Sequence, residues 1–133
     1  MREFFAENVE ETERIGERLG RMLRTGDVVF LYGELGAGKT ALTRGIARGM
    51  GIEARVKSPT FTIVREYGRL FHFDLYRVGS EDELFDIGFE SYLSRGVCVV
   101  EWPQAAERIT DCTVRVDIEY EGEGRRIRLS TDI

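Results

Sequence analysis

One eight-residue segment combines glycine, lysine and threonine at a spacing that suits phosphate binding. Gly33-Glu34-Leu35-Gly36-Ala37-Gly38-Lys39-Thr40 fits the pattern G-x-x-x-x-G-K-[ST] and lies between an apolar run and a helical pattern. Glycines let backbone N–H groups converge on an anion, and the N-terminus of the following helix adds about half a positive charge. We expect all eight residues to line a nucleotide site, with Lys39 on the β- and γ-phosphates and the Thr40 hydroxyl on Mg²⁺.

Two acidic residues stand where apolar strands are predicted to end. Asp74 closes the run 70–73, and Glu101 closes the run 97–100. A carboxylate at the end of a strand near a phosphate loop can hold the metal or orient the attacking water. A turn or cap role remains an alternative for Asp74. An acid has little structural reason to end a fully apolar strand, so Glu101 is the better candidate for water activation or metal support.

Three further features carry weaker signals. Ser58-Pro59-Thr60-Phe61-Thr62 is a polar, proline-fixed segment whose hydroxyls could sense a γ-phosphate, with an ordinary turn as the alternative. His72 alternates with Phe71 and Phe73, which predicts a packed or surface strand residue rather than a catalyst. Trp102 is predicted to belong to the core rather than to stack on a base.

The hydrophobic pattern predicts the elements that must position these residues. Helices are expected over residues 9–24 and 39–50. A short helix is expected to begin at the capping box 80–83, and a further helical turn at Pro103. Buried strands are expected at 28–32 and 97–100, and strand pairs at 63–67 with 70–74 and at 113–121 with 125–130. We predict a single P-loop ATPase domain over residues 1–133. Its fold would be α/β with three layers and a mostly parallel central sheet, extended by antiparallel strands and a C-terminal hairpin.

Composition limits the class of partner and the compartment. The 133 residues include 24 acidic and 19 basic ones, a net charge of −5 that is the wrong sign for gripping nucleic acid directly. Any role on RNA would therefore go through a partner. No apolar run approaches a membrane span, and the N-terminus turns acidic before a signal region could form. Two cysteines make no disulfide framework, so we expect a soluble cytoplasmic protein.

Three other functions fit a phosphate loop read alone. A GTPase needs an Asn-Lys-x-Asp element to recognise guanine. The only asparagine, Asn8, precedes the loop, which argues against a GTPase. A small-molecule kinase would need an acceptor pocket and an arginine-rich lid, and no clear lid insertion appears between Arg77 and Val97. A nucleotide-gated scaffold, in which binding rather than hydrolysis matters, remains the non-enzymatic alternative.

Taken together, four sequence blocks resemble the TsaE (YjeE) family in order and spacing. The blocks are residues 31–40, Lys57-Ser58-Pro59-Thr60-Phe61, His72-Phe73-Asp74-Leu75-Tyr76-Arg77 and Val100-Glu101-Trp102-Pro103. The resemblance implies a Mg²⁺-dependent ATPase needed in bacteria to make N6-threonylcarbamoyladenosine at position 37 of tRNAs that read codons beginning with A. It also implies docking on an assembly of the TsaB and TsaD proteins, which carry out the transfer, so that tRNA is engaged only indirectly.

Matching positions carry the family's functional residues onto this chain. Lys39 and Thr40 correspond to the phosphate and Mg²⁺ residues, Thr60 to a switch-like segment, and Asp74 and Glu101 to two functional acids. On this basis Lys39, Asp74 and Glu101 are the expected catalytic residues, and Thr40, Asp74 and Glu101 the expected metal residues. No arginine stands out as a finger for the transition state, so hydrolysis should be slow without a partner.

Overall fold

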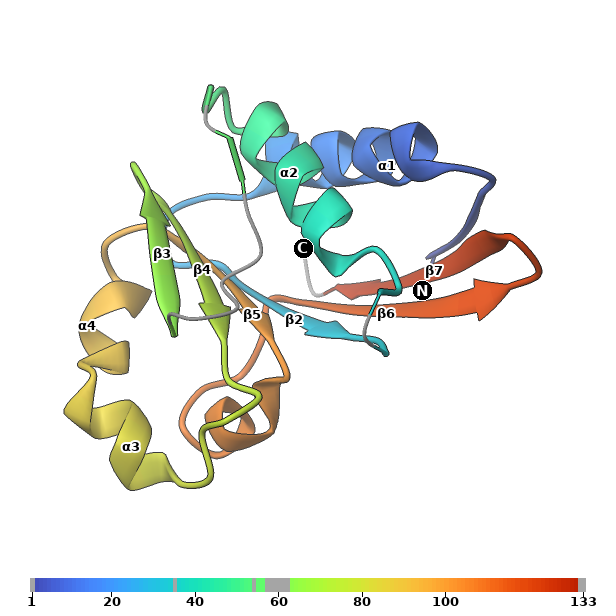
Figure 1. The fold of residues 1–133 in the computed structure, drawn as a ribbon. Helices are drawn as coiled ribbons and strands as arrows, with labels where there is room; N and C mark the ends of the chain where they lie inside the picture. The colour runs from blue at the N-terminus through green and yellow to red at the C-terminus, as the bar shows by residue number, and fades with distance from the viewer. Residues whose placement is uncertain (1, 35, 54, 57–62, 132–133) are drawn as a thin grey trace.

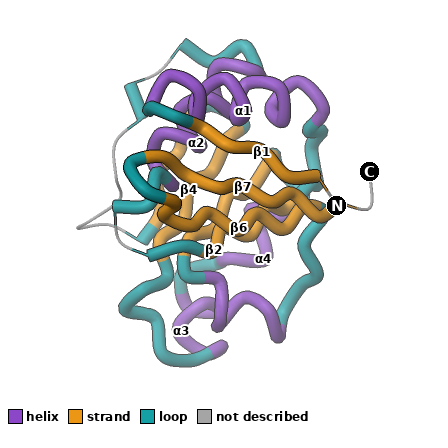
Figure 2. The backbone as a smooth tube through the Cα atoms, turned by 90° about the vertical axis from the view of Figure 1, so that its right-hand side faces the viewer, coloured by secondary structure: helices purple, strands orange, loops and turns teal. Residues whose placement is uncertain are grey.

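The computed structural model describes residues 2–34, 36–53, 55–56 and 63–131. Seven strands form one mixed sheet in the order β1-β7-β6-β2-β5-β4-β3. Its central strands are parallel to one another: β6 (Val114–Glu121), β2 (Val28–Tyr32), β5 (Val97–Glu101) and β4 (Leu70–Asp74). Antiparallel strands extend both sides, β3 (Val64–Tyr67) beyond β4, and β7 (Gly124–Thr131) with β1 (Arg2–Ala6) beyond β6. Figure 2 shows β1, β7, β6 and β2 side by side.

Helices cover both faces of the sheet, which gives three layers (Figure 1). The long helices α1 (Val9–Met22) and α2 (Lys39–Gly49) lie on one face. The other face carries the short helices α3 (Glu81–Asp86) and α4 (Phe89–Leu93) and the 3-10 helix η1 (Pro103–Arg108). Because successive strand residues point to opposite faces, Val29 and Leu31 of β2 pack under α1 and α2, whereas Val28 and Phe30 pack on the other side. The predicted α/β fold is confirmed.

Helices α1 and α2 approach each other through glycine. Two glycines four residues apart on each helix, Gly16 with Gly20 and Gly45 with Gly49, face the backbone of the other helix. A Cβ atom at any of these positions would lie 2.0–2.3 Å from a carbonyl oxygen of that helix. Contacts this short do not occur, so only glycine permits the observed approach. The chain segment that follows the phosphate loop is therefore packed backbone against backbone.

Aromatic side chains pack the opposite face. The rings of Phe73 and Phe89 meet edge to face with centroids 4.9 Å apart, and Phe71 meets Tyr92 in the same way at 4.9 Å. The predicted capping box begins α3, because the Ser80 hydroxyl accepts a hydrogen bond from the Glu83 amide. Side-chain interlocking, rather than close backbone approach, holds this layer.

Most predicted elements are confirmed, and two elements of the structure were not predicted. Helix α1 ends at Met22 rather than at residue 24, and Gly124 is the first residue of β7 rather than part of the turn. Strand β1 was not predicted, since its partner β7 lies at the other end of the chain. Helix α4 is only five residues long and was also missed. Within the described residues, no helix has the length and apolar character needed to cross a membrane.

Candidate phosphate-binding and catalytic site

The phosphate loop, residues 33–40, connects the end of β2 to the start of α2. Gly36 and Gly38 adopt φ angles of +82° and +109°, a left-handed region that side chains rarely occupy. Helix α2 begins at Lys39 without a side-chain cap among the described residues. Its first backbone N–H groups are thus left to an anion, and the helix dipole favours one. The local structure is that of a phosphate cradle.

Lys39 points back into this loop. Its side chain is 5% exposed, and Nζ donates a hydrogen bond to the Gly33 carbonyl oxygen at 2.8 Å. The same Nζ lies 3.7 Å from Glu101 Oε1 and 3.9 Å from the centroid of the Trp102 ring. Burial lowers the pKa of Lys39, while the nearby carboxylates of Glu101 and Asp74 act to raise it. A phosphate oxygen entering the loop would replace a carbonyl as the acceptor for this ammonium group.

The two predicted acids lie beside each other at the carboxyl edge of the sheet. Strand β5 lies between β2 and β4, and the register pairs Glu101 with Leu31 on one side and with Asp74 on the other. Both acids therefore end strands next to the strand that leads into the loop. Glu101 is buried, with 6% exposure, whereas Asp74 is half-buried. Asp74 Oδ1 also accepts a hydrogen bond from the Tyr76 amide at 3.0 Å, so the acid stabilises the turn after β4 as well.

Glu101 has a second partner that sequence reasoning missed. His72 of β4 is fully buried, and its Nε2 lies 2.5 Å from Glu101 Oε2. Of the two predicted alternatives, a packed or a surface strand residue, the packed one is correct, but the prediction omits this hydrogen bond. The Phe-His-Phe alternation gives no sign of it, because the partner lies 29 residues further along the chain.

Trp102 is not a core residue. It is half-buried and adopts a φ angle of +54°, the only positive φ of a non-glycine residue among the described ones. Such a conformation costs about 1–3 kcal/mol and clusters at functional sites. Here it sets the indole against the Lys39 ammonium group, while the ring of Tyr76 meets it edge to face at 5.0 Å.

A residue of the C-terminal hairpin also supports the loop. Arg125 Nε donates to the Ala37 carbonyl oxygen at 3.0 Å, and Nη2 lies 3.5 Å from the Gly36 carbonyl oxygen. The guanidinium stacks on Tyr120, 4.2 Å from the ring centroid. The sequence of the hairpin gave no signal for this contact, because Arg125 and Ala37 lie 88 residues apart.

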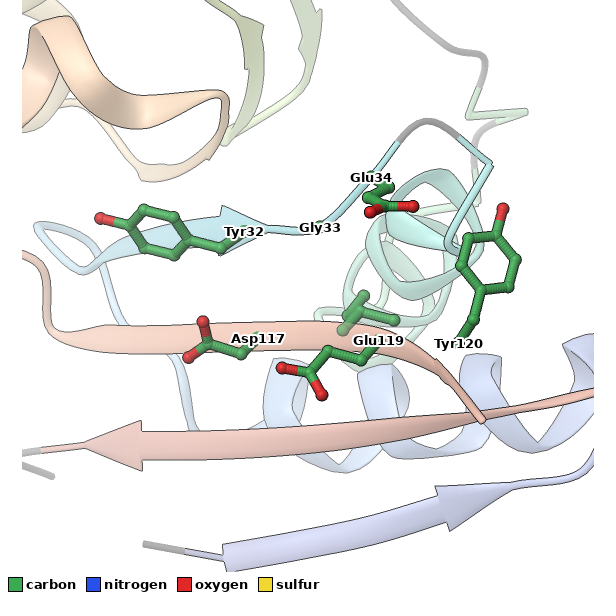
Figure 3. Close-up of a pocket in the computed structure, with 7 residues that line it drawn as sticks. Tyr32, Gly33, Glu34, Asp117, Glu119 and Tyr120 are labelled. Atoms are coloured by element: carbon green, nitrogen blue, oxygen red, sulfur yellow. The ribbon is translucent and has the colours of Figure 1, made fainter. Parts of the chain in front are cut away.

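A pocket of about 310 Å³ adjoins the start of the loop (Figure 3). Glu34, Asp117 and Glu119 place three carboxylates in its wall. Carboxylates repel phosphate and accept hydrogen bonds from hydroxyl or amino groups. The pocket is therefore unsuited to phosphate, whereas the side of the loop that Lys39 occupies presents a positive charge.

The donor set near Lys39 fits Mg²⁺ that arrives with a nucleotide. Thr40 is the second residue of α2 and half-buried, and Asp74 ends the strand beyond Glu101. In the described ranges no three histidine, cysteine or acidic side chains are grouped to hold a metal by themselves. Mg²⁺ commonly takes one or two protein oxygens with phosphate oxygens and waters, so a hydroxyl and a carboxylate suffice. Leu35 and Thr60, also predicted for the site, lie outside the described residues.

Comparisons with known proteins agree on one family. The model of the family described as threonylcarbamoyl adenosine biosynthesis protein TsaE matches residues 6–128. The protein named tRNA threonylcarbamoyladenosine biosynthesis protein TsaE in Treponema pallidum is 41% identical over 124 residues, covering 90% of this chain and 92% of the relative. The Bacillus subtilis protein of the same name is 42% identical over 125 residues, covering 90% of this chain and 78% of the relative. The crystal structure of Bacillus subtilis YdiB superposes with a TM-score of 0.79 at 33% identity, covering 98% of this chain and 84% of that one.

Proposed function

We propose, since the chain belongs to the TsaE family, that it binds and hydrolyses ATP with Mg²⁺ in the synthesis of tRNA N6-threonylcarbamoyladenosine. The relatives are named biosynthesis proteins of this modification. The observation that carries the ATPase part is the placement of Lys39. Its buried ammonium group lies inside the phosphate loop and 3.7 Å from the carboxylate of Glu101. The residue that binds phosphate and the acid that orients the water would thus lie side by side.

In the proposed mechanism the loop binds the phosphates through backbone N–H groups and Lys39. Lys39 gives up the Gly33 carbonyl and donates to oxygens of the β- and γ-phosphates. The Thr40 hydroxyl and the Asp74 carboxylate hold Mg²⁺, directly or through water. The metal, when bound, offsets negative charge on the phosphate oxygens. Glu101 accepts a hydrogen bond from the attacking water, whose oxygen bonds to the γ-phosphorus while the bridging oxygen to the β-phosphate leaves.

A partner is part of the proposal. The expected assembly contains the TsaB and TsaD proteins, and ATP hydrolysis would reset it between turnovers. No arginine of the described site is placed as a finger on the γ-phosphate, because Arg125, which contacts the loop, is engaged with backbone carbonyl groups. We therefore expect slow hydrolysis alone and faster hydrolysis in the assembly. The net charge of −5 supports contact with tRNA through the partners rather than directly. We also propose that the protein works in the cytoplasm.

Two variants test the site, and each affects a different step. Lys39→Ala should weaken ATP binding at least about tenfold, because a charged hydrogen-bond donor to phosphate is lost. Glu101→Gln should bind ATP as the unmodified protein does, yet release phosphate about 100-fold more slowly or worse, since a neutral amide is a weaker acceptor for the water than a carboxylate and cannot take its proton. Calorimetry measures binding, and phosphate release under single-turnover conditions measures hydrolysis. Normal hydrolysis by Glu101→Gln would remove Glu101 from the mechanism.

The partner proposal has a separate test. The protein is co-purified with TsaB and TsaD proteins in the presence and absence of ATP, and ATP turnover is compared with and without them. We expect association that depends on the nucleotide and a higher rate in the assembly. Absence of association in both states would overturn the partner proposal while leaving ATP binding intact.

A further inference from the structure

His72 is a buried polar residue that the mechanism above does not use. It lies on β4 with 0% exposure, and its neighbours Phe71 and Phe73 point into the aromatic face of the sheet. Strand alternation directs His72 to the face that carries α2, the same face as Asp74 two residues later. The register pairs His72 with Val99 and Asp74 with Glu101. The imidazole therefore lies one strand over and two residues below the acid that it contacts.

Glu101 is held from two sides by partners of different kinds. Lys39 Nζ lies 3.7 Å from Oε1, and His72 Nε2 lies 2.5 Å from Oε2. Lys39 belongs to the phosphate loop, and its ammonium group must turn toward phosphate when nucleotide enters. His72 belongs to a strand paired on both sides, with Arg65 of β3 and Val99 of β5. We therefore expect the histidine contact, unlike the lysine contact, to remain when nucleotide binds.

The chemistry of the imidazole favours a role for this hydrogen bond. A buried polar atom without a partner costs about 1–3 kcal/mol. No described residue forms a hydrogen bond with His72 Nδ1. A position used only for packing would be better filled by an apolar side chain. The hydrogen bond between Nε2 and Glu101 offsets the free-energy cost of the unpartnered Nδ1.

We propose that His72 is a positioning residue, whose Nε2–H donates to Glu101 Oε2 and keeps Oε1 directed at the phosphate loop while Lys39 binds nucleotide. This inference rests on the proposed function, because it assigns a support to the acid that orients the water. An ionised carboxylate only accepts hydrogen bonds, so Nε2 carries the hydrogen in this pair. Loss of the support leaves the nucleotide site intact and the water poorly placed. The effect therefore falls on the hydrolysis rate and not on the affinity for ATP.

The test compares three variants of the full chain. His72→Phe removes the donor and keeps a planar ring, whereas His72→Gln keeps a side-chain N–H donor. Phe71→Leu is the matched control, since it loosens the adjacent buried position on the other face of β4. ATP affinity is measured by calorimetry, hydrolysis by single-turnover phosphate release, and folding by urea unfolding.

We expect His72→Phe to hydrolyse ATP about 10–100-fold more slowly, the range typical for loss of a supporting hydrogen bond, with ATP affinity changed less than about threefold. His72→Gln should recover part of the rate, and Phe71→Leu should lose stability without losing rate. Hydrolysis by His72→Phe at the rate of the unmodified protein would overturn the proposal. An equal loss of rate and affinity in both His72 variants would also overturn it, because that pattern indicates a structural role.

A spectroscopic measurement keeps the proposal testable if His72→Phe does not fold. In the unmodified protein the Nε2 proton should give a far-downfield proton resonance that moves upfield in Glu101→Gln. An unchanged resonance would show that the bond does not exist in solution and would overturn the proposal. Failure of the proposed function has a different signature, since the unmodified protein would then release no phosphate with or without its partners. If Glu101→Gln is inactive and His72→Phe is not, only the role of His72 fails.

Discussion

The two faces of the sheet are packed by different means, and only one of them carries the phosphate loop. On the face of α1 and α2, four glycines bring two helix backbones into direct contact. On the face of α3 and α4, aromatic rings interlock edge to face. A backbone contact leaves no side-chain rotamer to adjust, whereas an aromatic layer can repack after a substitution. The helix that must present N–H groups to phosphate is thus the one held most rigidly in position.

The largest expected effect comes from adding a methyl group to one of the four glycines between α1 and α2. In Gly45→Ala the new Cβ would lie 2.0 Å from the Glu13 carbonyl oxygen. Helix propensity alone would favour alanine by about 1 kcal/mol. The clash should outweigh it and lower the free energy of unfolding by about 3 kcal/mol or more, since α1 and α2 must separate. ATP affinity should fall as well, because α2 carries the loop. Urea unfolding and calorimetry measure the two effects.

Gly79→Ala is the matched control for this substitution. Its φ lies outside the left-handed region, and the nearest atom to a new Cβ is the flexible Glu83 carboxylate at 3.6 Å. The free energy of unfolding should change by less than about 0.5 kcal/mol. If Gly45→Ala were as harmless as Gly79→Ala, the two faces would not differ as described.

A smaller effect is expected on the aromatic face. Phe89→Leu removes a ring that meets Phe73 at 4.9 Å and should lower the free energy of unfolding by about 1–2 kcal/mol. ATP affinity should not change, because this face does not carry the loop. A loss of ATP affinity matching that of Gly45→Ala would contradict the assignment of rigidity to one face.

A further test concerns the loop itself, whose backbone carbonyl groups Arg125 contacts. Arg125→Lys removes the fork that reaches the Ala37 and Gly36 carbonyl groups, so the loop backbone should be less well ordered. The loss of about 1 kcal/mol corresponds to roughly fivefold weaker ATP binding, measured by calorimetry. Arg126→Lys is the neighbouring control, since Arg126 pairs with Glu121 away from the loop. Equal affinities of the two variants would exclude a role for Arg125.

The smallest effect concerns a thiol of the aromatic face. Burial raises the pKa of Cys98 from 9.0 to about 12. Between these values the unfolded chain loses the thiol proton while the folded chain keeps it, so stability falls as pH rises above about 9. Cys98→Ala should show a shallower fall in unfolding free energy between pH 9 and pH 10.5, and the same pH dependence as the unmodified protein between pH 7 and pH 8. Parallel curves throughout would argue against the buried thiol as the cause.

Local patterns predicted the parts of the molecule that depend on neighbours in the sequence. The phosphate loop follows from glycine spacing, and the strand ends at Asp74 and Glu101 follow from the apolar runs before them. Contacts between distant segments left no such pattern. The bond from His72 to Glu101 and the contact of Arg125 with Ala37 span 29 and 88 residues. The sequence therefore predicted where the glycine loop lies and which acids end the neighbouring strands, but not the contacts that support them.

Pairing of β1 with β7 has a consequence for the order in which the protein is made. Strand β7 is the last described element to leave the ribosome, and it brings both the partner of β1 and the side chain of Arg125. Until then the first strand has no neighbour in the sheet and the loop backbone lacks its clamp. At a synthesis rate of about 5–20 residues per second, β7 leaves the ribosome at least several seconds after β1. If the loop binds nucleotide as proposed, we expect full affinity only after the final hairpin has been translated.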